Sequence, residues 1–559
     1  IVYWLGEQLR KTLINPASDT ILFSDGLIKT GDNLQYLRLW WELISTDVNN
    51  KSRYRFCAKG GKERNYYGNL NNVVKWDEET RDYYRSDKVA RISPKYLWDK
   101  EGITWTKISS RGGTFRLLRK EDIAETGGPS LFLKDNVDGN DLLSFIGVIT
   151  SSLAPYILQG LNPTLNYQTG DVLRFPLPIK KEEALSSLVH SMIGSSKEDW
   201  DSFETSWDFQ RFALLDPNQG SQAGDLLEDA VTHLREYWDR VSEEQRQREI
   251  RNNEMVADAY GVRDDVPCDV LLERVSLKRN VAFAYPKDTP EVRNEKFAQD
   301  VVKELISYAV GCMFGRYSLD KPGLILASQG ETLNDFHAQI PNPSFEPDAD
   351  NVIPVTETDC FEDDIVTRFR RFLTVAFGKE NLAANIAYIE QVLGKSIRKY
   401  FVNDFYNDHV KMYSNRPIYW QYSSQTNNKG SFKALVYLHR YTPKTTNVVL
   451  NYLRDYANKI ADIADSLERS DRTTDKKQAA KLRKAILECK DYEDQTLYPL
   501  ATSNLEIDLD DGVLVNYLRM GKALRSIPAI EKKRKEVSTW TWPVHPLKEE
   551  DKEVRNGKE

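Results

Sequence analysis

The sequence predicts an α+β fold in which a β-rich domain precedes mostly helical domains. Residues 46–125 are rich in Tyr, Trp, Ile and Thr and contain short alternating runs such as GITWTKIS, which is typical of strands. From Leu226 onward, apolar residues recur with helical spacing. Across residues 447–492 the apolar spacing averages about 3.5 residues, with one polar interruption, and this predicts a long antiparallel helical hairpin.

The first 180 residues divide into two predicted segments. Residues 1–45 begin with a helix at 3–14, turn at Asn15-Pro16 and continue into a loop in which Gly31 permits a positive φ and Asp32 caps the next segment. Residues 46–180 form the β-rich domain. Its predicted features are Gly-Gly turns at 60–61 and 112–113, a helix over 141–159 broken near Pro155, and extended closing segments over 161–179.

Three further segments complete the predicted organisation. Residues 181–265 read as a helical spacer, because the stripe from Leu226 runs into a stretch that is charged on most sides. Residues 266–445 form a mixed, mostly helical domain with helices at 292–313 and 362–376, and the loop 326–350 between them is expected to lack regular structure. Residues 446–559 hold the hairpin and a C-terminal cap.

Charge is distributed unevenly along the chain. The formal net charge is −7, yet residues 51–120 contain 18 basic and 8 acidic residues together with 11 aromatic ones. Because neutralised phosphates supply most non-specific affinity for nucleic acid, this basic block is a candidate nucleic-acid surface. A solvated charged face over an aromatic core is the alternative.

Composition excludes several other classes of protein. No apolar run reaches the length of about 18–20 residues that spans a bilayer, so we expect no membrane segment and a cytoplasmic location. The five cysteines are scattered, which fits a reducing compartment, and the six histidines are dispersed, so we expect no metal site.

Motifs for nucleotide and methyl-group chemistry are absent. Gly394-Lys395-Ser396 imitates the end of a phosphate-binding loop, but Ile389 stands where its first glycine is required. The chain has no Pro-Pro dipeptide, so it has no Asn-Pro-Pro-aromatic site for a flipped base. Glu531-Lys532-Lys533 is a weak nuclease-type E-x-K motif. It lies downstream of Asp508, Asp510 and Asp511.

Several long stretches together resemble the C-terminal part of the adenine-specific DNA methyltransferases of BREX phage-defence systems, the PglX family. These stretches are YWLGEQLRK, SDGLIKTGDNLQYLRLWWEL, AKGGKERNYYGN, EGITWTKISSRGGTFR, LNPTLNYQTGDVLRFPLPI, ETSWDF, ISYAVGCMFGRYSLDKPGLI, KMYSNRPIYWQYSSQTNNKGSFKALVYLHRYT and DDGVLVNY. They occur in the order of the family and cover nearly the whole chain. The catalytic half of the family, with its S-adenosylmethionine site and Asn-Pro-Pro-Tyr motif, is missing from this sequence.

The resemblance implies that the intact protein methylates adenine at N6 and that this chain supplies DNA recognition and assembly. Residues 1–45 would then end the methyltransferase domain, and residues 46–180 would be the target-recognition domain. No cofactor is expected in this chain, and S-adenosylmethionine is expected in the missing N-terminal domain. The expected partners are double-stranded DNA, a methyltransferase domain of the same or a separate chain, and other phage-defence proteins.

Site residues are predicted from the same resemblance and from the basic block. Arg pairs with guanine edges in the major groove, whereas phosphate contacts fix register. The predicted phosphate contacts are Lys59, Lys62, Arg64, Lys107, Arg111, Arg116 and Arg119. The predicted base readers are Arg53, Arg55, Arg81, Arg85 and Arg91. Thr30, Gly31, Asp32 and Asn33 match a family loop at the domain junction, which either approaches DNA or caps a helix.

Two other functions stay open at the level of sequence. In the first, the chain would be an interaction scaffold of the defence complex with little affinity for DNA. In the second, it would be a fragment of a type IIG restriction enzyme. The fragment would require Mg²⁺-dependent cleavage that depends on Glu531.

Overall fold

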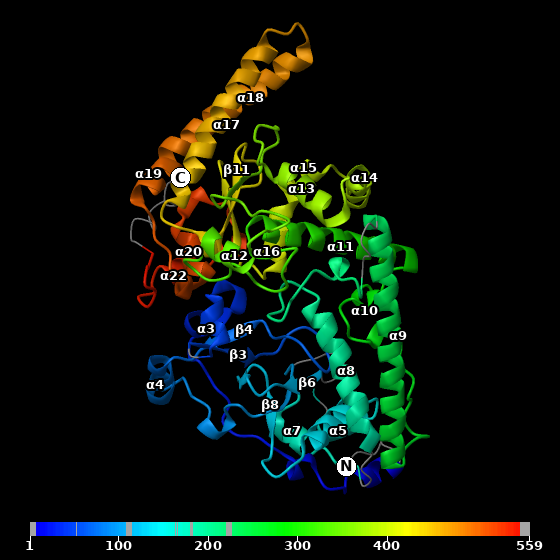
Figure 1. The fold of residues 1–559 in the computed structure, drawn as a ribbon. Coiled ribbons are helices and arrows are strands. Elements are labelled where there is room, and N and C mark those ends of the chain that lie inside the picture. The colour runs from blue at the N-terminus through cyan, green and yellow to red at the C-terminus, as the bar shows by residue number, and fades with distance from the viewer. Residues whose placement is uncertain are drawn as a thin grey trace. The chain divides into compact units, whose positions relative to one another are not determined.

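The computed structural model describes residues 7–51, 53–107, 114–162, 164, 166–178, 183–219 and 226–547. The chain forms two compact units (Figure 1). Unit 1 comprises Ile1–Trp40, Asp47–Phe209 and His233–Phe297, and unit 2 comprises Trp41–Thr46, Gln210–Thr232 and Ala298–Glu559. Small sheets and many helices confirm the predicted α+β class. The five predicted segments stay a prediction.

Unit 1 contains two four-stranded sheets. The first has the order β2–β4–β3–β7, with bounds Leu37–Leu39, Asn72–Lys75, Tyr54–Ala58 and Ile123–Ala124. The second has the order β1–β8–β5–β6, with bounds Leu22–Phe23, Ser130–Leu133, Gly102–Trp105 and Phe115–Leu118. Only the β3–β7 pair is parallel among these strands. The strand-rich character predicted for 46–125 is therefore confirmed.

Helices cover the second sheet with an apolar core. Trp105 and Phe115 from the sheet pack in one buried cluster with Phe145 of α5 (Gly139–Thr150), Val189 of α8 (Glu183–Asp201) and Val256 of α9 (Leu227–Tyr260). The indole N–H of Trp105 donates to the carbonyl of Tyr167, 3.0 Å away. The GITWT and LNPTLNY stretches are thus joined inside the core.

The predicted break near Pro155 in the helix 141–159 is confirmed: the segment is two helices, α5 and α6 (Ala154–Leu161), bent by 82°, and Pro155 occupies the first turn of α6. Two other local predictions for unit 1 need correction. Residues 169–173 form α7 (Thr169–Leu173) rather than an extended segment, because a Gln168–Asp171 capping box starts a helix there. The strand-rich region also contains α4 (Glu78–Ser86), which Asp77 caps by accepting from the Thr80 N–H.

Gly102 is required where β5 passes β8. A Cβ at this position would lie 1.9 Å from the carbonyl oxygen of Leu131, and that backbone oxygen cannot move without breaking the sheet. We expect Gly102→Ala to lower the free energy of unfolding by about 2–3 kcal/mol, measured by urea denaturation. Gly170→Ala in α7 is the control, because nothing lies within 4 Å of its added Cβ. Equal stability of the two variants would contradict this account.

Unit 2 is built around a three-stranded antiparallel sheet with the order β10–β11–β9. Its strands are Tyr419–Ser423, Lys433–Tyr437 and Val352–Pro354. Tyr419, Trp420 and Tyr437 are buried there. The longer surrounding helices are α11 (Pro290–Met313), α13 (Ile365–Phe377) and α14 (Leu382–Leu393), and the first two confirm predicted helices.

The predicted hairpin is present as α17 (Thr445–Glu468) and α18 (Thr473–Tyr492), which lie side by side (Figure 1). Val449, Leu453, Tyr456 and Ile460 are buried along it, as the apolar spacing predicted. The prediction for the loop 326–350 is wrong in one respect, because the loop contains α12 (Leu333–Gln339), which starts at a Thr332–Asp335 capping box.

Short helices complete the described chain. They are α1 (Glu7–Thr12), α2 (Asn33–Tyr36), α3 (Ser45–Asn49), α10 (Val281–Ala284), α15 (Ile397–Tyr400), α16 (Tyr406–Met412), α19 (Tyr498–Ser503), α20 (Gly512–Arg519), α21 (Pro528–Glu531) and α22 (Arg534–Val537). All five cysteines are free thiols. Among the described helices, none is by itself both long and apolar enough to cross a membrane, and only the bent pair α5 and α6 meets that criterion jointly.

Candidate nucleic-acid interface

Three loops of unit 1 meet at the ends of its strands. They are residues 59–62 after β3, residues 106–107 after β5, and residues 125–128 between β7 and β8; we call them the glycine-loop cluster. The Gly60 N–H donates to the Gly127 carbonyl over 3.3 Å. The Thr106 hydroxyl donates to the Gly61 carbonyl and accepts from its N–H, each over 3.3 Å. These bonds hold the three loops together.

Glycine allows this close approach. A Cβ at Gly128 would lie 2.6 Å from the Ala58 carbonyl oxygen, and a Cβ at Gly61 would lie 2.6 Å from the side chain of Asn69. Asn69 in turn donates to the carbonyl of Lys62, 2.9 Å away. The glycines of the matched KGGKERNYYGN stretch therefore shape the loop that carries the two lysines.

The glycine-loop cluster brings together three of the predicted phosphate contacts, Lys59, Lys62 and Lys107. Lys62 is exposed and the other two are half-buried. Within the described part of the chain, none of the three ammonium groups has a hydrogen bond or ion pair with a protein group. The nearby Glu125 carboxylate instead accepts from the Thr126 hydroxyl (2.9 Å) and the Gly127 N–H (2.7 Å). These lysines are available to bind an anion.

Arg64 was predicted to contact phosphate, and the structure assigns it a structural role instead. Its side chain is 6% exposed and forms an ion pair with Asp199, which is fully buried in α8. Arg64 also donates to the Tyr67 carbonyl (3.0 Å) and lies over the Trp200 ring. Gly68 leaves room for it, since a Cβ there would lie 2.6 Å from Arg64 Nε. A phosphate cannot reach this guanidinium without unpacking α8.

Arg116 is the second correction. It is 1% exposed, and it donates to the carbonyls of Thr114 (3.1 Å) and Arg64 (3.3 Å). Burial and the neighbouring Arg64 charge lower the pKa of Arg116 to about 10. Its position inside β6 makes it part of the core, so its guanidinium is not exposed to a phosphate.

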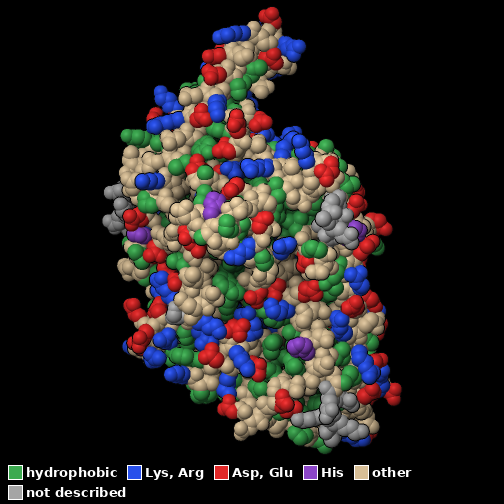
Figure 2. Space-filling model, viewed as in Figure 1, with side chains coloured by type: hydrophobic (Ala, Val, Ile, Leu, Met, Phe, Trp, Pro, Cys, Tyr) green, Lys and Arg blue, Asp and Glu red, His purple; other side chains and the backbone are tan. Residues whose placement is uncertain are grey.

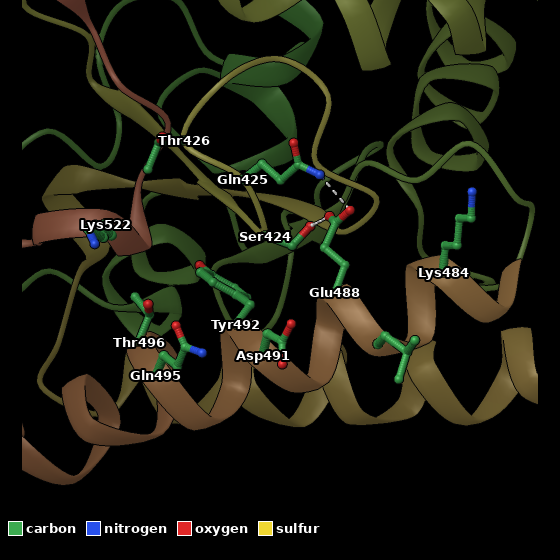
Figure 3. Close-up of a pocket in the computed structure, with 11 residues that line it drawn as sticks. Ser424, Gln425, Thr426, Lys484, Glu488, Asp491, Tyr492, Gln495, Thr496 and Lys522 are labelled. Atoms are coloured by element: carbon green, nitrogen blue, oxygen red, sulfur yellow. Dashed lines mark hydrogen bonds between the residues drawn. The ribbon is translucent and has the colours of Figure 1, made fainter. Parts of the chain in front are cut away.

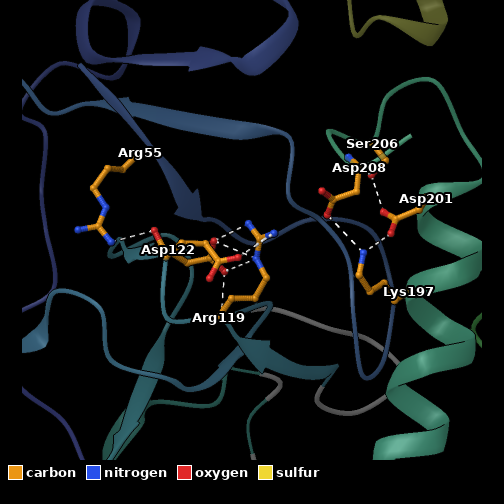
Figure 4. A network of polar contacts seen from close by, with 8 residues as sticks. Arg55, Arg119, Asp122, Lys197, Asp201, Ser206 and Asp208 are labelled. Carbon is orange, nitrogen blue, oxygen red and sulfur yellow. Dashed lines mark hydrogen bonds and ion pairs between the residues drawn. The ribbon is translucent and has the colours of Figure 1, made fainter. Parts of the chain in front are cut away.

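Arg119 and Arg55 are engaged with acidic residues of their own unit (Figure 4). Arg119 makes a bidentate contact with Asp122, with Nη2 2.7 Å from Oδ1, and its guanidinium lies over the Phe56 ring. Burial raises the pKa of the Asp122 carboxyl, although Arg119 opposes this. Arg55 is 5% exposed and donates to Asp99 over 2.7 Å. Neither arginine is free to contact a phosphate or a base.

The other predicted base readers are on α4 and on segments outside the three loops of the glycine-loop cluster. Arg81 and Arg85 are on α4, where Arg81 donates to the Trp76 carbonyl and Arg85 pairs with the exposed Asp82. Arg53 pairs with Asp47 over 3.1 Å. Arg91 is exposed, and its Nε donates to the Leu27 carbonyl. Base contact stays a prediction for these four. Arg111 lies outside the described residues.

The Thr30–Asn33 loop forms a helix cap. Asp32 accepts from the N–H groups of Leu34 (2.8 Å) and Gln35 (3.2 Å) and so starts α2, while the Thr30 hydroxyl donates to Asn33. Gly31 has φ +77°, and a Cβ there would lie 2.8 Å from the Tyr83 hydroxyl. The sequence left two roles open for this loop, an approach to DNA or a helix cap. These bonds favour the helix cap.

The motifs set aside in the sequence also have structural roles. Gly394 ends α14 in a left-handed conformation and Ser396 caps α15. Glu531 accepts from Arg534 over 3.0 Å, and Asp511 accepts from the N–H groups of Val544 and His545. Across the described ranges, no group of three or more His, Cys, Asp or Glu side chains is placed to hold a metal ion.

The sequence did not reveal two partners of this site. The sequence analysis did not identify the loop 125–128 as the third loop of the cluster, although the run Gly127-Gly128-Pro129 is a turn signal. Asp199, the counter-ion of Arg64, lies 135 positions along the chain. No local pattern could have paired them.

The chain is homologous to adenine-specific methyltransferases. It is 31% identical over 532 residues to the adenine-specific methyltransferase BrxX of Escherichia coli O9:H4 (strain HS) and 32% identical over 556 residues to the adenine-specific methyltransferase PglX of Lacticaseibacillus casei (strain Zhang). The alignments cover 90% and 93% of this chain but 43% and 44% of those proteins, so the chain spans less than half the length of these relatives. No family model matches the chain.

Proposed function

We propose that this chain is the DNA-recognition and assembly part of a site-specific N6-adenine DNA methyltransferase of a bacterial phage-defence system, acting in the cytoplasm. The observation that carries the proposal is the homology over about nine-tenths of the chain to two adenine-specific methyltransferases. Methylation itself is assigned to a part of the longer protein, or to a separate subunit, that is not included in these residues.

The glycine-loop cluster supports the DNA-binding half of the proposal. It gathers three lysines whose ammonium groups have no hydrogen bond or ion pair with a described residue, at the ends of two sheets where loops reach outward from a rigid scaffold. A lysine is a point charge that suits phosphate rather than base edges. The cluster would therefore hold the register of the duplex while other side chains read its sequence.

We propose that S-adenosylmethionine is bound outside this chain and not in its described pocket. That pocket lies at the base of α18, has a volume of about 460 Å³ and is lined mainly by polar and charged side chains (Figure 3). The Glu488 carboxylate, the type of group that would bind ribose hydroxyls, already accepts from Ser424, from Gln425 (2.7 Å) and from the Ser431 N–H (2.7 Å). We derive no methyl-transfer step from these residues.

Neutralising the glycine-loop cluster tests the proposal. We expect the triple variant Lys59→Gln, Lys62→Gln and Lys107→Gln to bind duplex DNA more weakly than the original chain, with a slope of log K against log salt that is smaller by about 0.9 for each lost phosphate contact. Fluorescence anisotropy with a labelled duplex at several salt concentrations measures both quantities. Charge reversal at Arg64 or Arg116 is not a suitable test of DNA binding. Both side chains are buried, so these changes would mainly affect folding.

A matched control removes the same charge from elsewhere in unit 1. Arg240, Arg274 and Lys287 are exposed, and changing all three to Gln should leave the salt slope unaltered. If the cluster variant and the control bind DNA equally well, the glycine-loop cluster is not the recognition surface. A chain that binds no duplex at low salt would favour the scaffold function.

A further inference from the structure

The α17–α18 connection and the first turns of α18 are rich in basic residues, whereas the facing end of α17 carries Asp462, Asp465 and Glu468. Residues 469–484 contain seven basic and two acidic residues, although the whole chain has a net charge of −7. The basic residues are Arg469, Arg472, Lys476, Lys477, Lys481, Arg483 and Lys484. In Figure 1 the connection between the helices lies at the end of the hairpin farthest from β11, and Figure 2 shows Lys and Arg side chains there interspersed with Asp and Glu.

Most of this charge is not neutralised by the protein. Arg483 is the exception, because it pairs with Asp465 and with Glu468 (2.9 Å) of α17. Lys481 pairs with Glu357 over 2.6 Å, but the two side chains are 71% and 60% exposed, so the pair is weak. The remaining five cations form no ion pair with any described residue.

The lysines of α18 form a stripe on one face. Lys477, Lys481 and Lys484 are spaced i, i+4 and i+7, so they point in the same direction and span roughly 10 Å along the axis. Phosphates on one DNA strand advance by about 3.4 Å each, so this stripe matches about three of them. Arg472, at the start of the helix, extends the charge beyond Lys477.

The composition of the tip favours a polyanion over a protein partner. Protein interfaces place aromatic or aliphatic side chains at their centre. Between residues 469 and 484 no large apolar side chain is exposed, since Leu482 is buried, and the first exposed one is Leu487 at 64%. Binding to phosphates needs only charge.

We propose that the outer end of the hairpin binds the phosphate backbone of duplex DNA and forms a contact independent of the glycine-loop cluster. The inference rests on the proposed DNA-binding function and adds a second surface to it. Because the stripe consists of lysines, which suit phosphate as point charges, we expect this contact to add affinity for duplex DNA of any sequence.

The test removes the three lysines of the α18 stripe at the tip. The full chain carrying Lys477→Gln, Lys481→Gln and Lys484→Gln is compared with the original chain by anisotropy on a duplex of random sequence. We expect the slope of log K against log salt to be smaller by about 2–3, since each lost phosphate contact removes about 0.9. Restoring the charge with Lys477→Arg and Lys484→Arg should restore the slope contributed by those two positions.

The control changes three exposed cations elsewhere in unit 2, Arg370, Arg371 and Lys379, to Gln. An unaltered thermal midpoint establishes that the tip variant is folded. If the tip variant keeps the original slope while the Lys59, Lys62 and Lys107 variant loses part of it, the inference is overturned and the proposed function stands. If only the tip variant loses slope, the hairpin binds DNA and the glycine-loop assignment fails. Loss of binding to polyglutamate without loss of binding to DNA would overturn the inference in favour of an acidic protein partner.

Discussion

Replacing Asp199 with alanine is expected to lower the free energy of unfolding by about 3–5 kcal/mol, because it leaves a charged guanidinium buried without its counter-ion. Asp199 is fully buried and accepts from Arg64 and from the N–H groups of Lys278 (2.8 Å) and Arg279 (2.7 Å). The substitution therefore also strands two backbone donors. Urea denaturation followed by tryptophan fluorescence measures the loss.

The matched control is Asp82→Ala on α4. Asp82 also pairs with an arginine, Arg85, but both side chains are largely exposed, so we expect a change below about 1 kcal/mol. The double variant with Arg64→Ala and Asp199→Ala should lose less stability than the sum of the losses in the two single variants, since the residues are in contact. A small effect of Asp199→Ala would mean that α8 does not pack on residues 64–68 as described.

The stability of the protein is expected to fall with rising pH because of Glu249. This residue of α9 is 8% exposed, and burial raises the pKa of its carboxyl to about 8, although the nearby Gln245 side chain opposes the shift. The folded state therefore keeps a proton that the unfolded state releases near its ordinary pKa of about 4.3. Between these two values, each pH unit costs about 1.4 kcal/mol, and the loss is complete above pH 8.

Glu249→Gln removes this titration. Relative to the original chain, the variant should gain stability steadily as the pH is raised from about 5 to 8, which denaturation curves at four pH values would measure. Glu236→Gln, an exposed position on the same helix, should leave the pH slope in place. Parallel pH profiles for the original chain and Glu249→Gln would contradict a protonated Glu249 in the folded state.

The elements that the sequence predicted best are those with local signals. The hairpin was predicted from the spacing of Val449, Leu453, Tyr456 and Ile460, all of which are buried. The capped helix α4 was missed even though Asp77, Glu78 and Glu79 are an ordinary N-terminal signal, because aromatic residues in the same stretch favoured strands. Local patterns compete in such a segment, and tertiary packing decides between them.

The candidate site was predicted in part. The sequence placed a basic, aromatic-rich block at 51–120, and the structure gathers Lys59, Lys62 and Lys107 of that block at one loop cluster. It also buries Arg64 and Arg116. An arginine that contacts phosphate and one that anchors a helix look the same in sequence, because the difference lies in a distant carboxylate.

The sequence by itself determined the α+β class, the hairpin and the kinship to adenine-specific methyltransferases, because periodicity and long motifs are carried by neighbouring residues. Only the tertiary structure decided which cations are free. Asp199 forms an ion pair with Arg64, which lies 135 positions away in the sequence. Asp122 pairs with Arg119, whose guanidinium lies over the Phe56 ring. Charge is a property of each residue, but whether it is neutralised depends on what folding brings within about 4 Å.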